Sequence, residues 1–175
     1  MGPLTSEIMK KALHRLDELS PVALQLIMGG GGAMILAHGY PRGTTDIDAI
    51  PRGMSMEVLD PLIKQIAREQ SLPIDWLNPY FATFSHTLPS DYGNRLICVF
   101  QGERIEVLAL GREEMLIMKC FAHRQKDVGH AKALIQAGAD ADRVFEHIEQ
   151  LRKKGIPLAD KAQDFLEDVM EQVDS

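Results

Sequence analysis

The sequence has little of what marks secreted, membrane-spanning or zinc-binding proteins. Its two cysteines, Cys98 and Cys120, lie in unlike contexts and form neither a disulfide framework nor a zinc site. Apolar runs such as Val22–Met28 are far shorter than the ~20 residues of a membrane helix. Met1–Lys10 lacks the basic start and apolar stretch of a secretory signal. These absences lead us to expect a cytoplasmic protein without membrane contact.

Positive charge is also scarce. The 175 residues include 19 Lys and Arg against 25 Asp and Glu, so the formal net charge is −6. This balance excludes a general nucleic-acid coat protein, although it allows a local basic groove. Apolar residues make up 45% and charged residues 25%, close to globular averages, and no repeat or low-complexity linker interrupts the chain. We therefore expect a folded domain with a substantial core.

Strand-like and helix-like patterns alternate in the first part of the chain. Apolar spacing and turn residues predict these elements in order: a helix over Ser6–Leu19, a buried strand over Val22–Met28, a short helix over Ala33–His38, a strand over Thr44–Ile50, a helix over Ser55–Glu69, a short strand over Ile74–Leu77, a long loop over Asn78–Gly93, and a hairpin of Arg95–Phe100 and Glu103–Leu110. From Arg112 onward the pattern is helical, and breaks at Gly138 and Gly155 predict three helices. This order indicates an α/β or α+β fold with C-terminal helices.

The segment from Gly29 to Pro51 carries the clearest chemical pattern. Asp46 and Asp48 flank Ile47 on a predicted strand, so the two carboxylates share one face while Ile47 points into the core. Neighbouring carboxylates repel each other unless a positive group lies between them. Mg²⁺ is commonly held by one or two carboxylates together with substrate phosphates, and a third carboxylate would allow a two-metal site.

Four glycines, Gly29 to Gly32, come between the first predicted strand and the following helix. A glycine turn at this point lets backbone N–H groups approach phosphate oxygens closely. Glycines alone and Asp-x-Asp alone are both weak signals. The combination of strand, glycine turn, helix and Asp-x-Asp on the next strand is far more specific.

This combination resembles the nucleotidyltransferase superfamily of the polymerase-β type. Gly30 and Gly31 are followed by fourteen residues before Asp46, and Gly31 stands where many members have serine. The form of the segment is similar to the bacterial abortive-infection group of AbiEii-like, type IV toxin nucleotidyltransferases. The matching residues are Gly30, Gly31, Ala33, Gly39, Arg42, Thr44 or Thr45, Asp46 and Asp48. The resemblance implies a mixed sheet flanked by helices, with residues 1–137 as the catalytic core and 138–175 as a helical extension of the same domain.

A second block, Leu116–Val128, also matches that group. The group carries a helix of the type Leu-x-x-Lys-x-x-Ala, then Arg, then Asp, and its lysine and aspartate are expected near the active site. Lys119 and Asp127 are the corresponding residues here. Read without the family, Lys119, His123, Lys126 or Asp127, and His130 recur at helical spacing on one face of an otherwise apolar helix. Such a cationic stripe fits a triphosphate, while Asp127 could instead orient Lys119.

The third carboxylate has two candidates. Asp75 is placed on the strand after the intervening helix, where the family carries its third acid, and Glu106 lies on a later strand beside Glu103 and Arg104. We favour Asp75 as a ligand and keep Glu106 as the rival. For the nucleotide, the resemblance points to Gly30, Gly31, Arg42, Thr45, Lys119 and Lys126, with Arg42 either contacting the triphosphate or bracing its loop.

The expected activity is Mg²⁺-dependent transfer of a nucleoside monophosphate from an NTP to an acceptor hydroxyl, with two ions held by Asp46, Asp48 and Asp75. The resemblance implies a toxin-like role in a toxin–antitoxin or phage-defence system, with a tRNA 3′ end, a protein or a small molecule as acceptor and a cognate antitoxin as a further partner. The rivals are an antibiotic-type nucleotidyltransferase and a catalytically silent nucleotide-binding module. The acidic tail Asp160–Ser175 is either an outer helix or a dimer contact, so the oligomeric state stays open.

Overall fold

The computed structural model describes residues 2–175, which form two compact units. The sheet unit comprises residues 2–82 together with Leu96–Leu110, and the helical unit comprises Thr83–Arg95 together with Gly111–Ser175. The sequence-based boundary at residue 137 stays a prediction.

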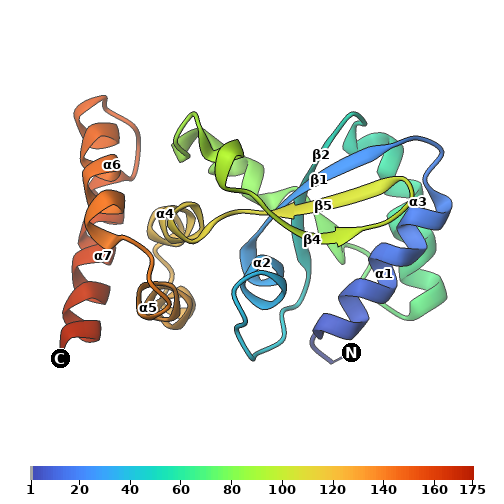
Figure 1. Ribbon diagram of the computed structural model, residues 1–175, viewed down its shortest axis with the longest axis horizontal. Helices are drawn as coiled ribbons and strands as arrows, with labels where there is room; N and C mark the ends of the chain where they lie inside the picture. The colour runs from blue at the N-terminus through green and yellow to red at the C-terminus, as the bar shows by residue number, and fades with distance from the viewer. Residues whose placement is uncertain (1) are drawn as a thin grey trace. The chain divides into compact units, whose positions relative to one another are not determined.

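The sheet unit is built on a mixed sheet whose strand order is β3-β2-β1-β5-β4 (Figure 1). The central strand β1 pairs antiparallel with β2 and parallel with β5, while β2 pairs parallel with β3 and β4 antiparallel with β5. The strands are β1 (Leu24–Gly29), β2 (Ile47–Arg52), β3 (Leu77–Asn78), β4 (Ile97–Gln101) and β5 (Ile105–Ala109). This mixed sheet with its flanking helices confirms the predicted α/β fold class.

Three helices accompany this sheet: α1 (Ser6–Leu19), α2 (Gly30–Leu36) and α3 (Met56–Gln70). The Thr5 side chain accepts the Ile8 N–H and so caps α1, whose apolar stripe includes the buried Met9 and Leu16. Helix α3 follows Ser55 and continues through Pro61. The predicted helices over 6–19 and 55–69 are therefore confirmed.

Glycine allows α2 to lie close to the sheet. A Cβ atom on Gly32 would stand 3.3 Å from Met28 Sδ on β1 and 3.6 Å from Met9 Sδ on α1. Ile47 on β2 is also fully buried, with its Cα 3.9 Å from the same point. Met28 and Ile47 thus belong to the sheet face that α1 and α2 cover. Because side chains alternate along a strand, Gly29 and Asp48 belong to the opposite face.

The described part of the helical unit contains four α-helices rather than the three that the sequence predicted. They are α4 (Arg112–Ala122), α5 (Val128–Gln136), α6 (Ala141–Lys153) and α7 (Ala159–Asp174). The prediction missed a break at His123, which ends α4 in a left-handed conformation with φ of 38°. No glycine or proline marks this break. Ion pairs from Lys119 and Arg124 to Asp127 stabilise the turn instead.

Short 3₁₀ helices fill the segment that the sequence predicted as a long loop, namely η1 (Tyr80–Thr83), η2 (Ser85–Thr87) and η3 (Tyr92–Arg95), and η4 (Gln125–Asp127) leads into α5. Nowhere in residues 2–175 is a helix both long enough and apolar enough to cross a bilayer.

The carboxylate of Asp17 fastens the β4–β5 hairpin to α1. Asp17 Oδ1 accepts the backbone N–H groups of Arg104 and Ile105, each at 2.8 Å, and Oδ2 accepts that of Glu103 at 3.1 Å. Burial raises the pKa of Asp17, but these three hydrogen bonds outweigh it and hold the pKa below its ordinary value of 3.8. One side chain thus satisfies three backbone donors of the hairpin turn.

We expect Asp17→Ala to lower the free energy of unfolding by about 2 kcal/mol, because the three N–H groups lose an ionised acceptor. The lowered pKa means that this stabilisation is complete above the unfolded-state pKa and is lost as the pH falls through the folded-state pKa. The difference between wild type and variant in urea unfolding should therefore shrink below a pH of about 4. Glu18→Ala, which removes only surface ion pairs, should cost no more than about 0.5 kcal/mol. An equal loss in both variants would contradict the role given to Asp17.

Candidate active site

Asp46 and Asp48 lie where β2 passes the end of β1. Strand β2 begins at Ile47, so Asp46 immediately precedes it and Asp48 pairs with Gly29 on one side and Asn78 on the other. The buried Ile47 points to the helix-covered face, as predicted, and the two carboxylates flank it. This arrangement brings both acids close to the strand-to-helix connection at Gly29.

Backbone and amide donors orient both carboxylates. Asp48 is 8% exposed, and its Oδ1 accepts the Phe81 N–H at 2.6 Å. Asp46 Oδ2 accepts Asn78 Nδ2 at 3.0 Å. Sequence reasoning missed Asn78 and Phe81, since both reach the site through the pairing of β3 with β2. The only sequence signal was a polar residue directly after the apolar pair Trp76-Leu77.

The glycine cluster begins α2 instead of forming a separate turn. Gly30 has a φ of +61°, and a Cβ atom there would stand 2.9 Å from the Asp48 Cβ. A Cβ atom on Gly31 would stand 2.5 Å from Thr44 Oγ1. Only glycine fits these two positions without displacing a neighbour. The start of α2 is therefore packed directly against the side chains of Asp48 and Thr44.

The other residues predicted for the nucleotide or a metal are less closely grouped. Arg42 and Thr45 are exposed on the connection between α2 and β2. Asp75 is exposed in the turn before β3, two residues ahead of the strand, and its backbone carbonyl accepts Asn78 Nδ2 at 3.3 Å.

Glu106 on β5 pairs with Gln25, and its Oε2 accepts Gln25 Nε2 at 3.0 Å. Gln25 lies at the opposite end of β1 from Gly29. Within residues 2–175 no group of three or more His, Cys, Asp or Glu side chains is arranged to hold a metal ion. The choice between Asp75 and Glu106 stays a prediction.

Lys119 and Asp127 form a buried ion pair in the helical unit. Lys119 Nζ lies 2.7 Å from Asp127 Oδ1, and the two side chains are 6% and 2% exposed. Arg124 Nε binds Asp127 Oδ2 at 2.6 Å. Burial raises the pKa of Asp127, but the hydrogen bonds and charges of Arg124 and Lys119 outweigh it, so that the pKa lies below its ordinary range.

The helix break changes how this cluster forms. Asp127 reaches Lys119 because the chain turns at His123, whereas the sequence placed both on one continuous helix face. The neighbouring Lys126, predicted to contact the NTP, is exposed on the same turn. Asp127 is thus a counter-ion of both Lys119 and Arg124, and its predicted place near an active site stays a prediction.

Comparison with known families gives one match. The model of family DUF6036, described as "Nucleotidyltransferase of unknown function", matches residues 7–156. No curated protein and no solved structure matches the chain. The match covers both sequence blocks and supports the nucleotidyltransferase part of the resemblance. The finer assignment to the AbiEii-like group stays a prediction.

The Lys119–Asp127 pair yields a stability test. Asp127→Ala should lower the free energy of unfolding by about 3 kcal/mol, because it leaves a buried ammonium without this counter-ion. Lys119→Met should cost less, since it keeps the apolar stem and Arg124 still pairs with Asp127. Chemical unfolding monitored by circular dichroism measures both. Asp168→Ala on exposed helix surface should change stability by about 0.5 kcal/mol at most. Equal costs for the Asp127 and Asp168 variants would contradict the buried pair.

Proposed function

Because this chain belongs to the DUF6036 family of nucleotidyltransferases, we propose that it transfers a nucleoside monophosphate from an NTP to an acceptor hydroxyl. The observation that carries the proposal is the close approach of Gly30 to Asp48, with Asp46 beside them. Two oriented carboxylates at the glycine-rich start of α2 suit a phosphate chain accompanied by Mg²⁺. The family resemblance alone would support the reaction class but would not choose these residues.

The donor set at this point fits Mg²⁺. Asp46 and Asp48 offer carboxylate oxygens, the ligands that this hard cation prefers, and Asn78 and the Phe81 amide orient them. A single ion held there by Asp46 and Asp48 would need further oxygen ligands, which water and substrate phosphates commonly supply. When bound, Mg²⁺ neutralises phosphate charge and lowers the pKa of an attached hydroxyl. A second ion, with Asp75 as a further ligand, belongs to the same proposal.

The residues of the chain then act by positioning and charge. The acceptor oxygen forms a bond to the α-phosphorus, the bond from that phosphorus to the pyrophosphate oxygen breaks, and Asp46 or Asp48 accepts the proton of the hydroxyl. We propose that the N–H groups of Gly30 and Gly31 bind phosphate oxygens at the point where α2 packs against Asp48 and Thr44. This proposal includes NTP binding by Arg42, Thr45, Lys119 and Lys126, as the family resemblance implies.

The proposal covers several classes of acceptor. A tRNA 3′ end, and with it a toxin-like role opposed by a cognate antitoxin, follows from the AbiEii-like resemblance. The cations between Lys119 and Lys132 would suit RNA, yet Asp127 pairs with both Lys119 and Arg124. This pairing reduces the positive charge available to an RNA backbone. The experiment is to incubate the protein with Mg²⁺, total RNA and each ³²P-labelled NTP in turn. The band that gains label identifies the acceptor. Loss of all labelling in EDTA tests the requirement for a metal ion.

We expect Asp46→Asn and Asp48→Asn to reduce labelling at least about 100-fold, because each removes charge that the metal requires. Both variants should stay folded, since an asparagine oxygen can still accept the Phe81 amide or the Asn78 side chain. Thermal unfolding provides that check. Asp142→Asn, an exposed carboxylate on α6, is the matched control and should keep full activity. Labelling at the wild-type rate in a folded Asp46 or Asp48 variant would reject the site.

Asp75→Asn and Glu106→Gln separate the two candidates for the third carboxylate. The sequence favours Asp75, so the first variant should lose at least about tenfold in kcat/KM and the second should lose little. Mg²⁺ titration of the rate provides a second measurement, because a lost ligand raises the Mg²⁺ concentration for half-maximal activity. The reverse order of effects would assign the role to Glu106.

A further inference from the structure

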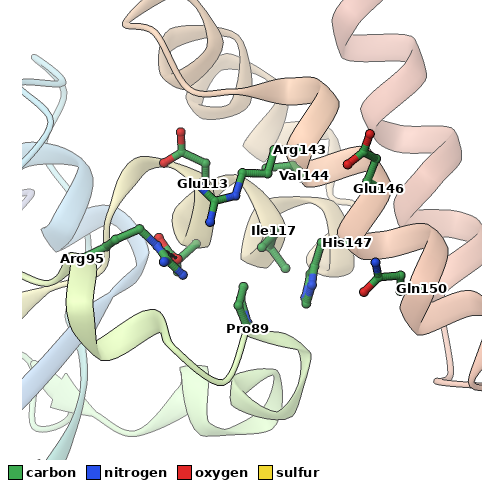
Figure 2. A pocket seen from close by; sticks show the side chains of 10 residues that line it. Pro89, Arg95, Glu113, Ile117, Arg143, Val144, Glu146, His147 and Gln150 are labelled. Carbon is green, nitrogen blue, oxygen red and sulfur yellow. Dashed lines mark hydrogen bonds and ion pairs between the residues drawn. The ribbon is translucent and has the colours of Figure 1, made fainter.

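The helical unit contains a cavity of about 240 Å³ that plays no part in the proposed transfer. Side chains from α4, α6 and the segment Pro89–Arg95 line it (Figure 2). Its charged lining residues are Arg95, Glu113, Glu114, Arg143 and Glu146, and its other polar ones are His147 and Gln150. These groups determine which kind of ligand the cavity can bind.

Glu114 in the cavity lining has a buried carboxylate oxygen without a hydrogen-bond partner among the described residues. Glu114 is fully buried, with 0% of its surface exposed, and its Oε1 accepts a hydrogen bond from Arg95 Nε at 2.6 Å. Its Oε2 is buried and has no hydrogen-bond partner among the described residues. A buried carboxylate oxygen without a donor is costly, and nearly all such groups in folded proteins find one. Glu114 belongs to the lining of the cavity, so a bound ligand is one source of the missing donor.

Arg143 places a guanidinium group in the lining of the same cavity. Its backbone N–H donates to Asp140 Oδ1, but its guanidinium makes no hydrogen bond or ion pair within residues 2–175. Figure 2 shows this side chain extending across the cavity toward Glu113 and Arg95. Arg95, by contrast, is held by Asp91 as well as Glu114. Arg143 is therefore the cation that the cavity offers to an anionic group.

His147 and the charges of the lining residues indicate a further property of the ligand. His147 Nε2 lies 2.7 Å from the Thr87 carbonyl oxygen, which can only accept, so this nitrogen carries a proton and Nδ1 of the neutral ring is an acceptor. Three carboxylates face two guanidinium groups in the lining. The cavity as a whole thus favours a ligand with a positive, hydrogen-donating group as well as an anionic one.

We propose that this cavity binds a small zwitterion of the amino-acid class, with its ammonium group at Glu114 Oε2 and its carboxylate at Arg143. The volume is below the roughly 300 Å³ at which pockets for drug-sized molecules begin, which suits a compact metabolite. The inference does not rest on the proposed transferase activity, because every group that it uses belongs to the helical unit.

Isothermal titration of the full chain with ω-amino acids, from glycine to 6-aminohexanoate, tests the proposal and measures the spacing of the two charged subsites. One chain length should bind with a Kd of about 1 mM or lower. Butylamine and butyrate carry one charge each and should bind at least about tenfold more weakly than the best zwitterion. Absence of binding below about 10 mM for every length would mean that Glu114 Oε2 is satisfied by water alone and would overturn the proposal. Equal affinity for butylamine would overturn it as well.

Two variants probe the two subsites separately. Glu114→Gln can keep the bond to Arg95 through its amide oxygen while it replaces the second acceptor by a donor, and Arg143→Met keeps the stem without the charge. Each should weaken binding of the best zwitterion by about ten- to a hundredfold. Lys153→Met, on the same helix as Arg143 but outside the cavity lining, should leave the affinity unchanged.

Unchanged affinity in a folded Arg143→Met variant would overturn the proposal even if Glu114→Gln failed to fold. Binding is measured without NTP or Mg²⁺, so a protein that lacks transferase activity but binds the zwitterion would reject only the proposed function.

Discussion

The close approach of Gly30 to Asp48 is the constraint on which the candidate site depends. Helix α2 begins beside the carboxylate-bearing strand because neither Gly30 nor Gly31 carries a Cβ atom. The same contact fixes where β2 runs, since Asp48 pairs with Gly29 in the adjacent register position. A side chain at Gly30 would need both a left-handed backbone and a displaced Asp48. The backbone conformation at Gly30 and the position of the Asp48 carboxylate therefore depend on each other.

Charged side chains in the two units are fixed by different means. Asp46 and Asp48 are oriented by an amide side chain and a backbone N–H, which act through hydrogen bonds at the edge of the sheet. Lys119 is oriented by a buried carboxylate, and its charge is balanced within its own unit. Both arrangements hold charged groups in place before any ligand arrives, which lowers the cost of reorganisation on binding.

Local sequence pattern predicted the sheet class, the helices at 6–19 and 55–69, and the grouping of glycines with Asp46 and Asp48. These features depend on residues close together in the chain, where periodicity and glycine placement are informative. Asn78 and Phe81 could not be predicted, because they reach the carboxylates through strand pairing across more than 30 positions. The break at His123 was missed for a similar reason. Ion pairs to Asp127, rather than a glycine or proline, stabilise that turn.

The attachment of Asp17 to residues 103–105 has a topological consequence. It joins positions 86 to 88 residues apart, and Gly30, Asp46, Asp48 and Asn78 all lie in the chain between them. The candidate carboxylates are thus enclosed in a loop of chain that is closed without any covalent bond. Closing so long a loop costs conformational entropy early in folding, so the hairpin that ends it is expected to dock late. The attachment is made by α1 and the β4–β5 hairpin, so it limits the opening of the strands inside the loop without itself involving Asp46 or Asp48.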